Sequence, residues 1–324
     1  MNLCGHYNGT FAVASVKASH SQPHLLPCRI RFAASVAAAV PISCYGARRG
    51  SGNRLAFTMS CCKAAIGRDV LVEENDVVSE TERSYTYVMK FGGSSVTSAE
   101  RMREVANLII SFPEERPVIV LSAMGKTTDL LLLAREKAVS CGVSNVDNIE
   151  ELSTIKDLHL RIVDELGVDR NVIAKHLEEL KQLLKGVAMM KELTRRTQDY
   201  LVSFGECMST RIFAAYLNKL GVKARQYDAF EMGIITTDDF TNVDILEATY
   251  PAVAKRLHGY WVSDPAIPIV TSFLGKARRS CAVTTLGRGG SDLTATTIGR
   301  ALGLLEIQVC NKNFCMSKAR MERC

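Results

Sequence analysis

Two strand-like runs separated by a helical segment constrain the fold of this chain more than any other feature. The second run, PVIVLSA at residues 117–123, is continuously apolar, as strands are when a parallel sheet buries them on both faces. The first run covers residues 85–91, and Thr97 and Glu100 follow it at the spacing of a capping box. Apolar residues then recur on one helical face, at Met102, Val105, Ala106 and Ile109. Strand, helix and strand in this order predict a parallel crossover unit.

The alternation of helices and strands continues through the rest of the chain. Helical patterns occupy residues 128–139, most of the region up to 198, 200–220 and 287–302, and strand-like runs occupy 222–227, 267–273 and 305–309. We therefore expect an α/β fold, a three-layer sandwich around a mainly parallel central sheet. An apolar stripe through Ile173, Leu180 and Leu184 marks a long helical pair. That pair could cover one edge of the sheet, cap an active site or pack in an oligomer.

The basic residues are concentrated at the N-terminus. The net charge is +6, and residues 1–68 contain eight Lys or Arg and no Asp or Glu, so the remainder carries −2. A basic surface for nucleic acid is therefore not expected on the folded part. The Ala-, Ser- and Arg-rich composition of this leader predicts a disordered plastid transit peptide, and the alternative is a basic tail that stays attached. Residues 69–83 become acidic and predict a solvated linker.

The sequence also disfavours a membrane protein and a metal centre. No window holds about 18 uninterrupted apolar residues, so we expect no transmembrane helix and no membrane partner. None of the 11 cysteines forms a CxxC pair, which argues against a zinc site or a disulfide framework. The three histidines after residue 68 have no ligand-like spacing, so no metal ligands are predicted.

The motif KFGGSS begins at Lys90, where the first predicted strand ends. In open α/β sheets, ligands bind beyond the carboxyl ends of the strands, and glycines there let backbone N–H groups approach anionic oxygens. Lys90 would supply a positive charge, and Gly92 and Gly93 would supply backbone donors. Ser94 and Ser95 would add hydroxyl donors. The set predicts a phosphate-binding loop, and the alternative is a Gly-Gly turn with the lysine in solvent.

The motif GRGGSD at residues 287–292 precedes the last predicted helix. Arg288 can bind a carboxylate through two parallel hydrogen bonds, and Asp292 can hold an ammonium group. An amino acid carries both of these groups. Alternatively, Arg288 is a surface charge and Asp292 is an ordinary residue of the first helical turn.

Two further stretches bear on the same ligand. Glu206, in SFGE, is a carboxylate in an otherwise apolar helix, and it could hold a ligand ammonium or pair with Arg211 on the exposed side. The GKT after the second strand is not a P-loop, because valine stands five residues before its glycine, where that motif needs another glycine. We expect the hydroxyls of Ser122, Thr127 and Thr128 to face the same ligand as the lysine of KFGGSS.

Four motifs in this order, KFGGSS, LSAMGKTTDLL, LVSFGE and TLGRGGSDLTA, resemble the aspartate kinases of the amino-acid kinase family, and their plant plastid form in particular. The resemblance covers about residues 84–309. It implies phosphorylation of the side-chain carboxylate of L-aspartate by MgATP, giving 4-phospho-L-aspartate, the first step towards lysine, threonine, methionine and isoleucine. It also implies the chloroplast stroma and, for full-length members, a homo-oligomer.

The resemblance assigns roles on the phosphate side. Lys90 would act as a catalytic residue, and together with Gly92, Gly93 and Ser94 it would bind the phosphates of ATP. Ser122 would lie beside the phosphate or the substrate, and Thr128 likewise. A carboxylate is already a competent nucleophile at neutral pH, so the scarcity of histidines is consistent with this chemistry. Alignment of the two anions and neutralisation of charge, with Mg²⁺, would lower the barrier.

The resemblance also assigns roles on the aspartate side. Arg288 would bind the α-carboxylate. Glu206 and Asp292 would bind the α-ammonium group, with Ser291 nearby, and Asp292 would be the second catalytic residue.

Residues 84–309 correspond in this resemblance to the substrate-binding part of the catalytic domain, and 310–324 to a tail outside the family. Family members continue with a nucleotide-binding segment and two ACT regulatory domains, which are absent from this sequence. The alternative to an active aspartate kinase is therefore a catalytically inactive truncated isoform that binds a substrate or a partner. We also expect an uncovered sheet edge after the last strand.

Overall fold

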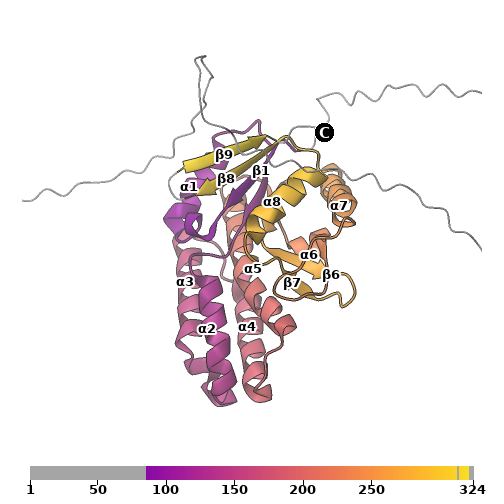
Figure 1. The fold of residues 1–324 in the computed structure, drawn as a ribbon. Helices are drawn as coiled ribbons and strands as arrows, with labels where there is room; N and C mark the ends of the chain where they lie inside the picture. Colours follow the sequence, from indigo (N-terminus) through magenta and orange to yellow (C-terminus); the bar gives the residue numbers. More distant parts are fainter. Residues whose placement is uncertain (1–84, 312–313, 321–324) are drawn as a thin grey trace, which may run out of the picture. The chain divides into compact units, whose positions relative to one another are not determined.

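The central feature of the fold is a six-stranded sheet (Figure 1). The structure is a computed structural model that describes residues 85–311 and 314–320, so the predicted leader and acidic linker lie outside the described residues. The strands are β1 Val88–Phe91, β2 Val118–Leu121, β3 Ala224–Tyr227, β5 Ile267–Thr271, β8 Glu306–Asn311 and β9 Phe314–Arg320. Their order is β3-β5-β2-β1-β8-β9, and all neighbours are parallel except β8 and β9. The predicted mainly parallel sheet is confirmed.

Helices cover both faces of this sheet. They are α1 Ala99–Ile110, α2 Thr127–Ser140, α3 Glu150–Leu166, α4 Asn171–Met190, α5 Arg195–Lys219, α6 Ala229–Met232, α7 Thr249–Ser263 and α8 Gly290–Ala301, with short 3₁₀ turns η2 Gly93–Ser95 and η3 Val143–Asn148. Alternate side chains of β1 point to opposite faces: Met89 packs with α1 to α5, and Val88 packs with α6 to α8. The predicted three-layer sandwich is therefore confirmed.

The apolar run at β2 is buried on both faces, as predicted. Val118 and Val120 contact the α6–α8 layer, and Ile119 and Leu121 contact the α1–α5 layer. All four side chains have no solvent exposure. A smaller three-stranded sheet, which the sequence did not predict, consists of β4 Ile235–Thr236, β6 Leu274–Ala277 and β7 Val283–Thr285.

The long helical pair is α3 and α4, which extend the α1–α5 layer beyond the sheet (Figure 1). The stripe through Ile173, Leu180 and Leu184 is buried in the cluster that these helices form with α2 and α5. The pair therefore does not cover a sheet edge. No helix in the described part of the chain is long and apolar enough to cross a membrane.

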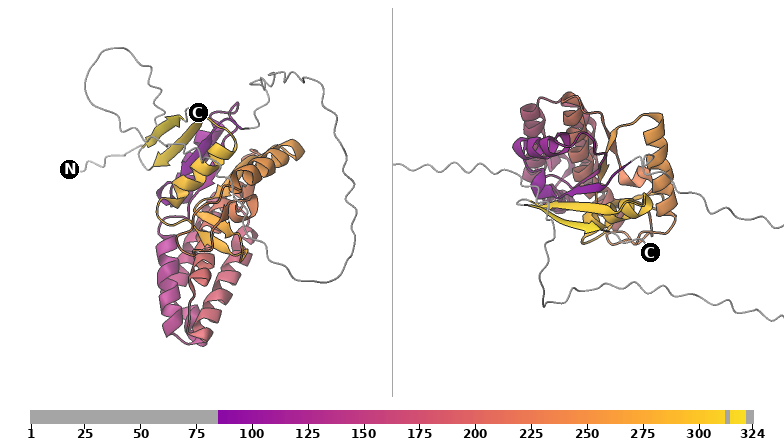
Figure 2. Two further views of the ribbon diagram at one scale, coloured as in Figure 1. Left: turned by 45° about the vertical axis from the view of Figure 1, so that its right-hand side comes forward. Right: turned by 90° about the horizontal axis from the view of Figure 1, so that it is seen from above.

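Two expectations about the ends of elements are wrong. Helix α1 is capped by Ser98, whose side chain accepts a hydrogen bond from the backbone N–H of Arg101. The capping box of Thr97 and Glu100 does not form, because the helix begins one residue later and places arginine at the reciprocal position. The edge of β8 is not uncovered either, because β9 pairs with it in an antiparallel ladder (Figure 2).

Candidate functional site

Lys90 lies at the carboxyl end of β1 and is largely enclosed. Its side chain is 11% exposed, and its Nζ lies 2.9 Å from Oδ1 of Asp292, in the first turn of α8. Two motifs from opposite ends of the described chain thus meet where the parallel strands end, the usual position of ligands in open α/β sheets. The alternative that placed the lysine in solvent is wrong.

Gly93 is required by a close approach of two loops. A Cβ atom at this position would lie 2.5 Å from the backbone oxygen of Ala123, and the N–H of Gly125 donates to the Gly93 oxygen at 3.1 Å. The loop after β1 therefore rests directly on the loop after β2. At Gly92 a Cβ would lie 3.8 Å from Lys90 Nζ, which is an ordinary van der Waals distance, so this position does not require glycine sterically.

The hydroxyl groups predicted to face the ligand have different roles. Ser94 is half-buried in η2, whereas Ser95 is buried and donates to the carbonyl of Cys310 at 3.4 Å. Thr128 is half-buried in the first turn of α2, but Thr127 is fully buried and donates to a carbonyl of its own turn at 2.6 Å. The prediction for Thr127 is therefore wrong: its hydroxyl supports the start of the helix.

A chain of hydrogen-bonded hydroxyls connects three elements at the strand ends. Ser122, after β2, donates to Ser291 of α8 at 3.2 Å, and its Oγ lies 3.1 Å from Oγ of Ser272. Ser272 follows β5 and donates to Glu206 Oε2 at 2.9 Å. Sequence reasoning missed Ser272. It stands directly after its strand, as Ser122 does, and that equivalence could have identified it.

Glu206 is buried in α5 and faces this chain of hydroxyls. Burial raises the pKa of its carboxyl group to about 8, although backbone donors from Ala123 and Ser272 and the nearby Lys90 charge favour the ionised form. Burial thus favours the protonated form of this carboxyl group, and a nearby positive charge favours the ionised form. The alternative pairing with Arg211 is wrong, because that guanidinium binds a different carboxylate.

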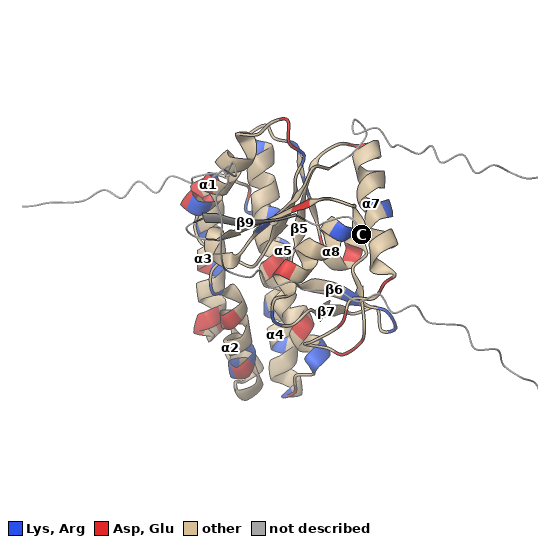
Figure 3. Cartoon of the chain, turned by 45° about the horizontal axis from the view of Figure 1, so that its top comes forward, with Lys and Arg blue, Asp and Glu red and all other residues tan. Residues whose placement is uncertain are grey.

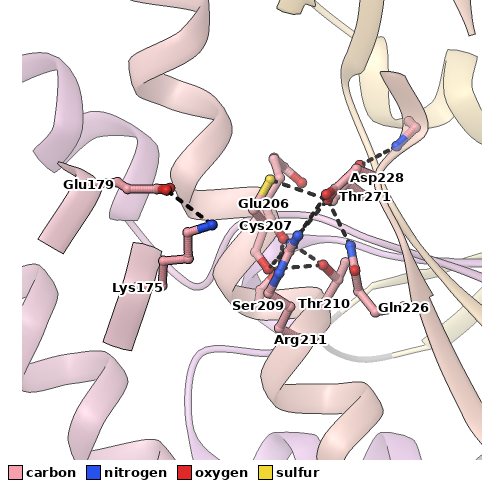
Figure 4. A network of polar contacts seen from close by, with 11 residues as sticks. Lys175, Glu179, Glu206, Cys207, Ser209, Thr210, Arg211, Gln226, Asp228 and Thr271 are labelled. Atoms are coloured by element: carbon pink, nitrogen blue, oxygen red, sulfur yellow. Dashed lines mark hydrogen bonds and ion pairs between the residues drawn. The ribbon is translucent and has the colours of Figure 1, made fainter. Parts of the chain in front are cut away.

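The partner of Arg211 is Asp228, which follows β3 (Figure 4). Two guanidinium nitrogens donate to its two carboxylate oxygens, at 3.1 and 2.7 Å. Gln226 and Cys207 donate to the same carboxylate. Sequence reasoning did not identify Asp228, which precedes the short helix α6 but makes no side-chain cap bond to it.

Asp199 is a second buried carboxylate that sequence reasoning missed. It accepts hydrogen bonds from the N–H groups of Thr241 and Thr285, at 2.9 and 3.0 Å, and from the Thr285 hydroxyl at 2.8 Å. Burial raises its pKa. It ties α5 to β7, the strand that leads into GRGGSD.

The GRGG turn owes its shape to its glycines. Gly287 and Gly289 have φ values of +70° and +74°, in the left-handed region that favours glycine. A Cβ at Gly290 would lie 2.6 Å from the ring of Phe273, so α8 begins in close contact with the segment after β5. Arg288 is exposed at the tip of this turn. In the described residues, no hydrogen bond or ion pair joins Arg288 to Lys90, Asp292 or Glu206.

The site as a whole combines one cation, two acids and several hydroxyls at the strand ends. Lys90, Asp292 and Glu206 lie around the Ser122–Ser272–Ser291 chain. Such a set can bind an ammonium group and an anion side by side. Within residues 85–311 and 314–320, no cluster of three or more His, Cys, Asp or Glu side chains could hold a metal ion.

Comparison with known proteins places the chain in a family. A model described as "Amino acid kinase family" matches residues 86–312. The chain is 63% identical to "Aspartokinase 1, chloroplastic" of Arabidopsis thaliana over 94% of this chain and 53% of that protein. It is 75% identical to "Aspartokinase 2, chloroplastic" of the same plant over 71% of this chain and 42% of that protein. The chain spans about half the length of the curated relatives it matches.

A solved structure agrees with the fold. "E. coli aspartokinase III in complex with aspartate and ADP" matches with a TM-score of 0.60 and 28% identity, over 69% of this chain and 48% of that one. The same enzyme in complex with lysine and aspartate matches with the same TM-score and 29% identity.

Proposed function

The chain belongs to the amino acid kinase family, and we propose that its strand-end site is that of an aspartate kinase. The reaction is transfer of the γ-phosphoryl group of ATP to the side-chain carboxylate of L-aspartate, giving 4-phospho-L-aspartate. Support comes from the aspartokinases that the chain resembles and from the aspartate and ADP in the complex of the bacterial relative.

The observation that carries the proposal is the position of the buried Glu206 beside Lys90 at the strand ends. The α-ammonium group of aspartate would pair with Glu206 and Asp292, which displaces the proton held by the buried carboxyl group. The side-chain carboxylate would then lie towards Lys90. Arg288, on its exposed turn, would close onto the α-carboxylate through two parallel hydrogen bonds.

The phosphates of ATP would lie over the loop after β1. Lys90 would neutralise charge on the transferring phosphoryl group, while Gly93 and Ser94 would offer donors without blocking the approach of the phosphates. Ser122 and Thr128 would contact the phosphate or the substrate from the neighbouring loop.

Magnesium fits the site as a companion of ATP. When bound, Mg²⁺ neutralises phosphate charge and holds the nucleotide in position. The part of the chain that the structure describes offers no cluster of three metal-binding side chains, so the phosphates would supply most ligands, with Asp292 as a candidate protein ligand.

We also propose the chloroplast stroma as the location and the lysine, threonine, methionine and isoleucine pathway as the context. The relatives are named chloroplastic, and residues 1–68 have the composition of a transit peptide. Residues 84–309 would be the catalytic part, and the full-length protein a homo-oligomer. A fluorescent fusion of residues 1–68 that stays in the cytosol would contradict the location, and light scattering tests the oligomer.

Trapping of the acyl phosphate tests the activity directly. The purified chain is incubated with MgATP, L-aspartate and hydroxylamine, which converts 4-phospho-L-aspartate into a hydroxamate that is detected as its coloured ferric complex. We expect hydroxamate that requires both substrates. Calorimetric aspartate binding without hydroxamate would favour the inactive isoform, and absence of both would refute the proposed site.

A further inference from the structure

Asp228 is a buried carboxylate that the proposed reaction does not use. It accepts four hydrogen bonds: two from Arg211, one from Gln226 at 2.7 Å and one from the Cys207 thiol at 3.3 Å. Burial, and then the Asp228 charge, raise the pKa of that thiol well above its ordinary value, so the thiol stays protonated and can donate. A buried carboxylate with this many donors is held firmly in one orientation.

These hydrogen bonds hold the turn of α5 that carries Glu206. Cys207 is the next residue, and Arg211 follows one turn later. The guanidinium also donates to the Cys207 carbonyl at 3.0 Å (Figure 4). Asp228 is therefore bonded to α5 directly beside Glu206 and again one turn along it.

A second set of contacts closes a ring around Glu206. The N–H of Ala229, next to Asp228, donates to the Thr271 hydroxyl at 2.8 Å. Thr271 is followed by Ser272, which donates to Glu206 Oε2. The loop after β3 and the end of β5 are thus fixed to each other, and α5 is bonded to both.

We propose that Arg211 and Asp228 are positioning residues that orient Glu206 towards the ammonium group of the ligand. They do so by fixing its turn of α5 relative to Ser272. The identity of the ligand rests on the proposed function, whereas the orientation of Glu206 does not. An ion pair with a purely structural role would affect folding stability alone.

The orientation of Glu206 has its own spectroscopic signature. The charged and titratable groups around it are Lys90 from β1, which pairs with Asp292, and the Cys207, Arg211 and Asp228 group. Burial is the largest cause of its raised pKa. If its turn shifts, water reaches the carboxyl group, and its pKa falls from about 8 towards the ordinary 4.5.

The experiment compares Asp228→Asn and Arg211→Lys with the parent chain. Asp164→Asn is the control, because Asp164 near the end of α3 also accepts two hydrogen bonds from one guanidinium, that of Arg170 at the start of α4. Titration calorimetry measures L-aspartate and MgATP binding, thermal melting reports folding, and ¹³C NMR follows the Glu206 carboxyl titration, assigned with Glu206→Gln. Arg211→Lys keeps the charge and loses the two-bond geometry, and it replaces Asp228→Asn if that variant does not fold.

We expect both pair variants to bind aspartate about tenfold more weakly than the parent chain, while the affinity for MgATP changes by less than about twofold. The pKa of Glu206 should fall in both variants. The control should match the parent. Folded pair variants with parental aspartate affinity and a parental Glu206 titration would overturn the inference. If the parent itself binds no aspartate, the proposed function fails, and the Glu206 titration alone then decides the positioning role.

Discussion

Two bidentate arginine–aspartate pairs occupy very different surroundings. Arg211–Asp228 joins α5 to the loop after β3, with side chains that are 21% and 7% exposed. Arg170–Asp164 joins the ends of α4 and α3, with 63% and 46% exposed. Both are bidentate. They differ in burial and in hydrogen bonding. Arg211 donates through Nη1 and Nη2 and Arg170 through Nε and Nη2, and Asp228 also accepts from Gln226 and Cys207.

The same contrast separates the two regions as a whole. The first region consists of helices α2, α3 and α4, where they extend beyond the sheet. Charges of both signs lie along α2 and α4 (Figure 3), and ion-pair partners lower the pKa of exposed carboxylates such as Asp164. At the strand ends, burial raises the pKa of Glu206 and of Asp199. Exposed pairs contribute little to stability, whereas removal of one partner from a buried pair is costly. Ionisable groups kept in such surroundings often serve a ligand.

Substitution of a lysine in each region should give the largest contrast, which we expect in kcat. Lys90→Ala removes the charge that stabilises the transferring phosphoryl group, so we expect kcat to fall by about 100-fold or more. Lys175→Ala, on the exposed surface of α4, should leave kcat unchanged. Aspartate-dependent ADP formation measures both. A kcat within about threefold of the parent for Lys90→Ala would remove the catalytic role.

Substitution of an arginine in each region should give the next largest contrast, which we expect in the aspartate KM. Arg288→Ala should raise the aspartate KM by about tenfold or more, with a smaller change in the ATP KM, because a bidentate contact to the α-carboxylate is lost. Arg161→Ala, equally exposed on α3, is the control. Equal aspartate KM values for the Arg288 variant and the parent would contradict its assignment.

The raised pKa of Glu206 predicts a pH effect on binding. Only the ionised carboxylate pairs with an ammonium group, so aspartate affinity should rise by roughly tenfold per pH unit up to a pH of about 8. Glu206→Gln should remove this dependence. Calorimetry from about pH 6 to about pH 8 is the test, and a flat profile for the parent would contradict the role.

The same group has the opposite effect on folding. The folded-state pKa of about 8 exceeds the ordinary 4.5, so the contribution of Glu206 to the free energy of unfolding is fully present below 4.5 and is lost as pH rises towards 8.

Substitution of a glycine in each region should affect the free energy of unfolding differently. Gly93→Ala forces a Cβ to 2.5 Å from a backbone oxygen, and we expect a loss of about 1–3 kcal/mol in the free energy of unfolding. Gly142→Ala, near the start of η3, meets nothing closer than 3.9 Å and should be close to neutral. Urea denaturation measures both variants. Equal midpoints would show that the loops after β1 and β2 are not in close contact.

Sequence reasoning was most successful where local pattern determines structure. The apolar run of β2 and the helix after it follow from burial and periodicity, and Lys90 and Asp292 were both identified from their motifs. That they meet as an ion pair could not be read from either motif, because it depends on the order of strands in the sheet.

The residues that were missed lie outside the motifs. The position of Ser272 directly after its strand is a local signal, but the importance of Ser272, Asp228 and Asp199 comes from contacts with α5 or β7, far away in sequence. Thr127 was misassigned for the opposite reason. Its position beside Thr128 suggested a shared role, but only the fold determines which hydroxyl faces inward.

Calorimetric titration of the parent chain with L-aspartate and with succinate tests the central claim most directly. Succinate has both carboxylates of aspartate but lacks the ammonium group. If Glu206 and Asp292 hold that group at the strand ends, aspartate should bind and succinate should bind at least about tenfold more weakly. Equal affinities, or no aspartate binding, would contradict the account.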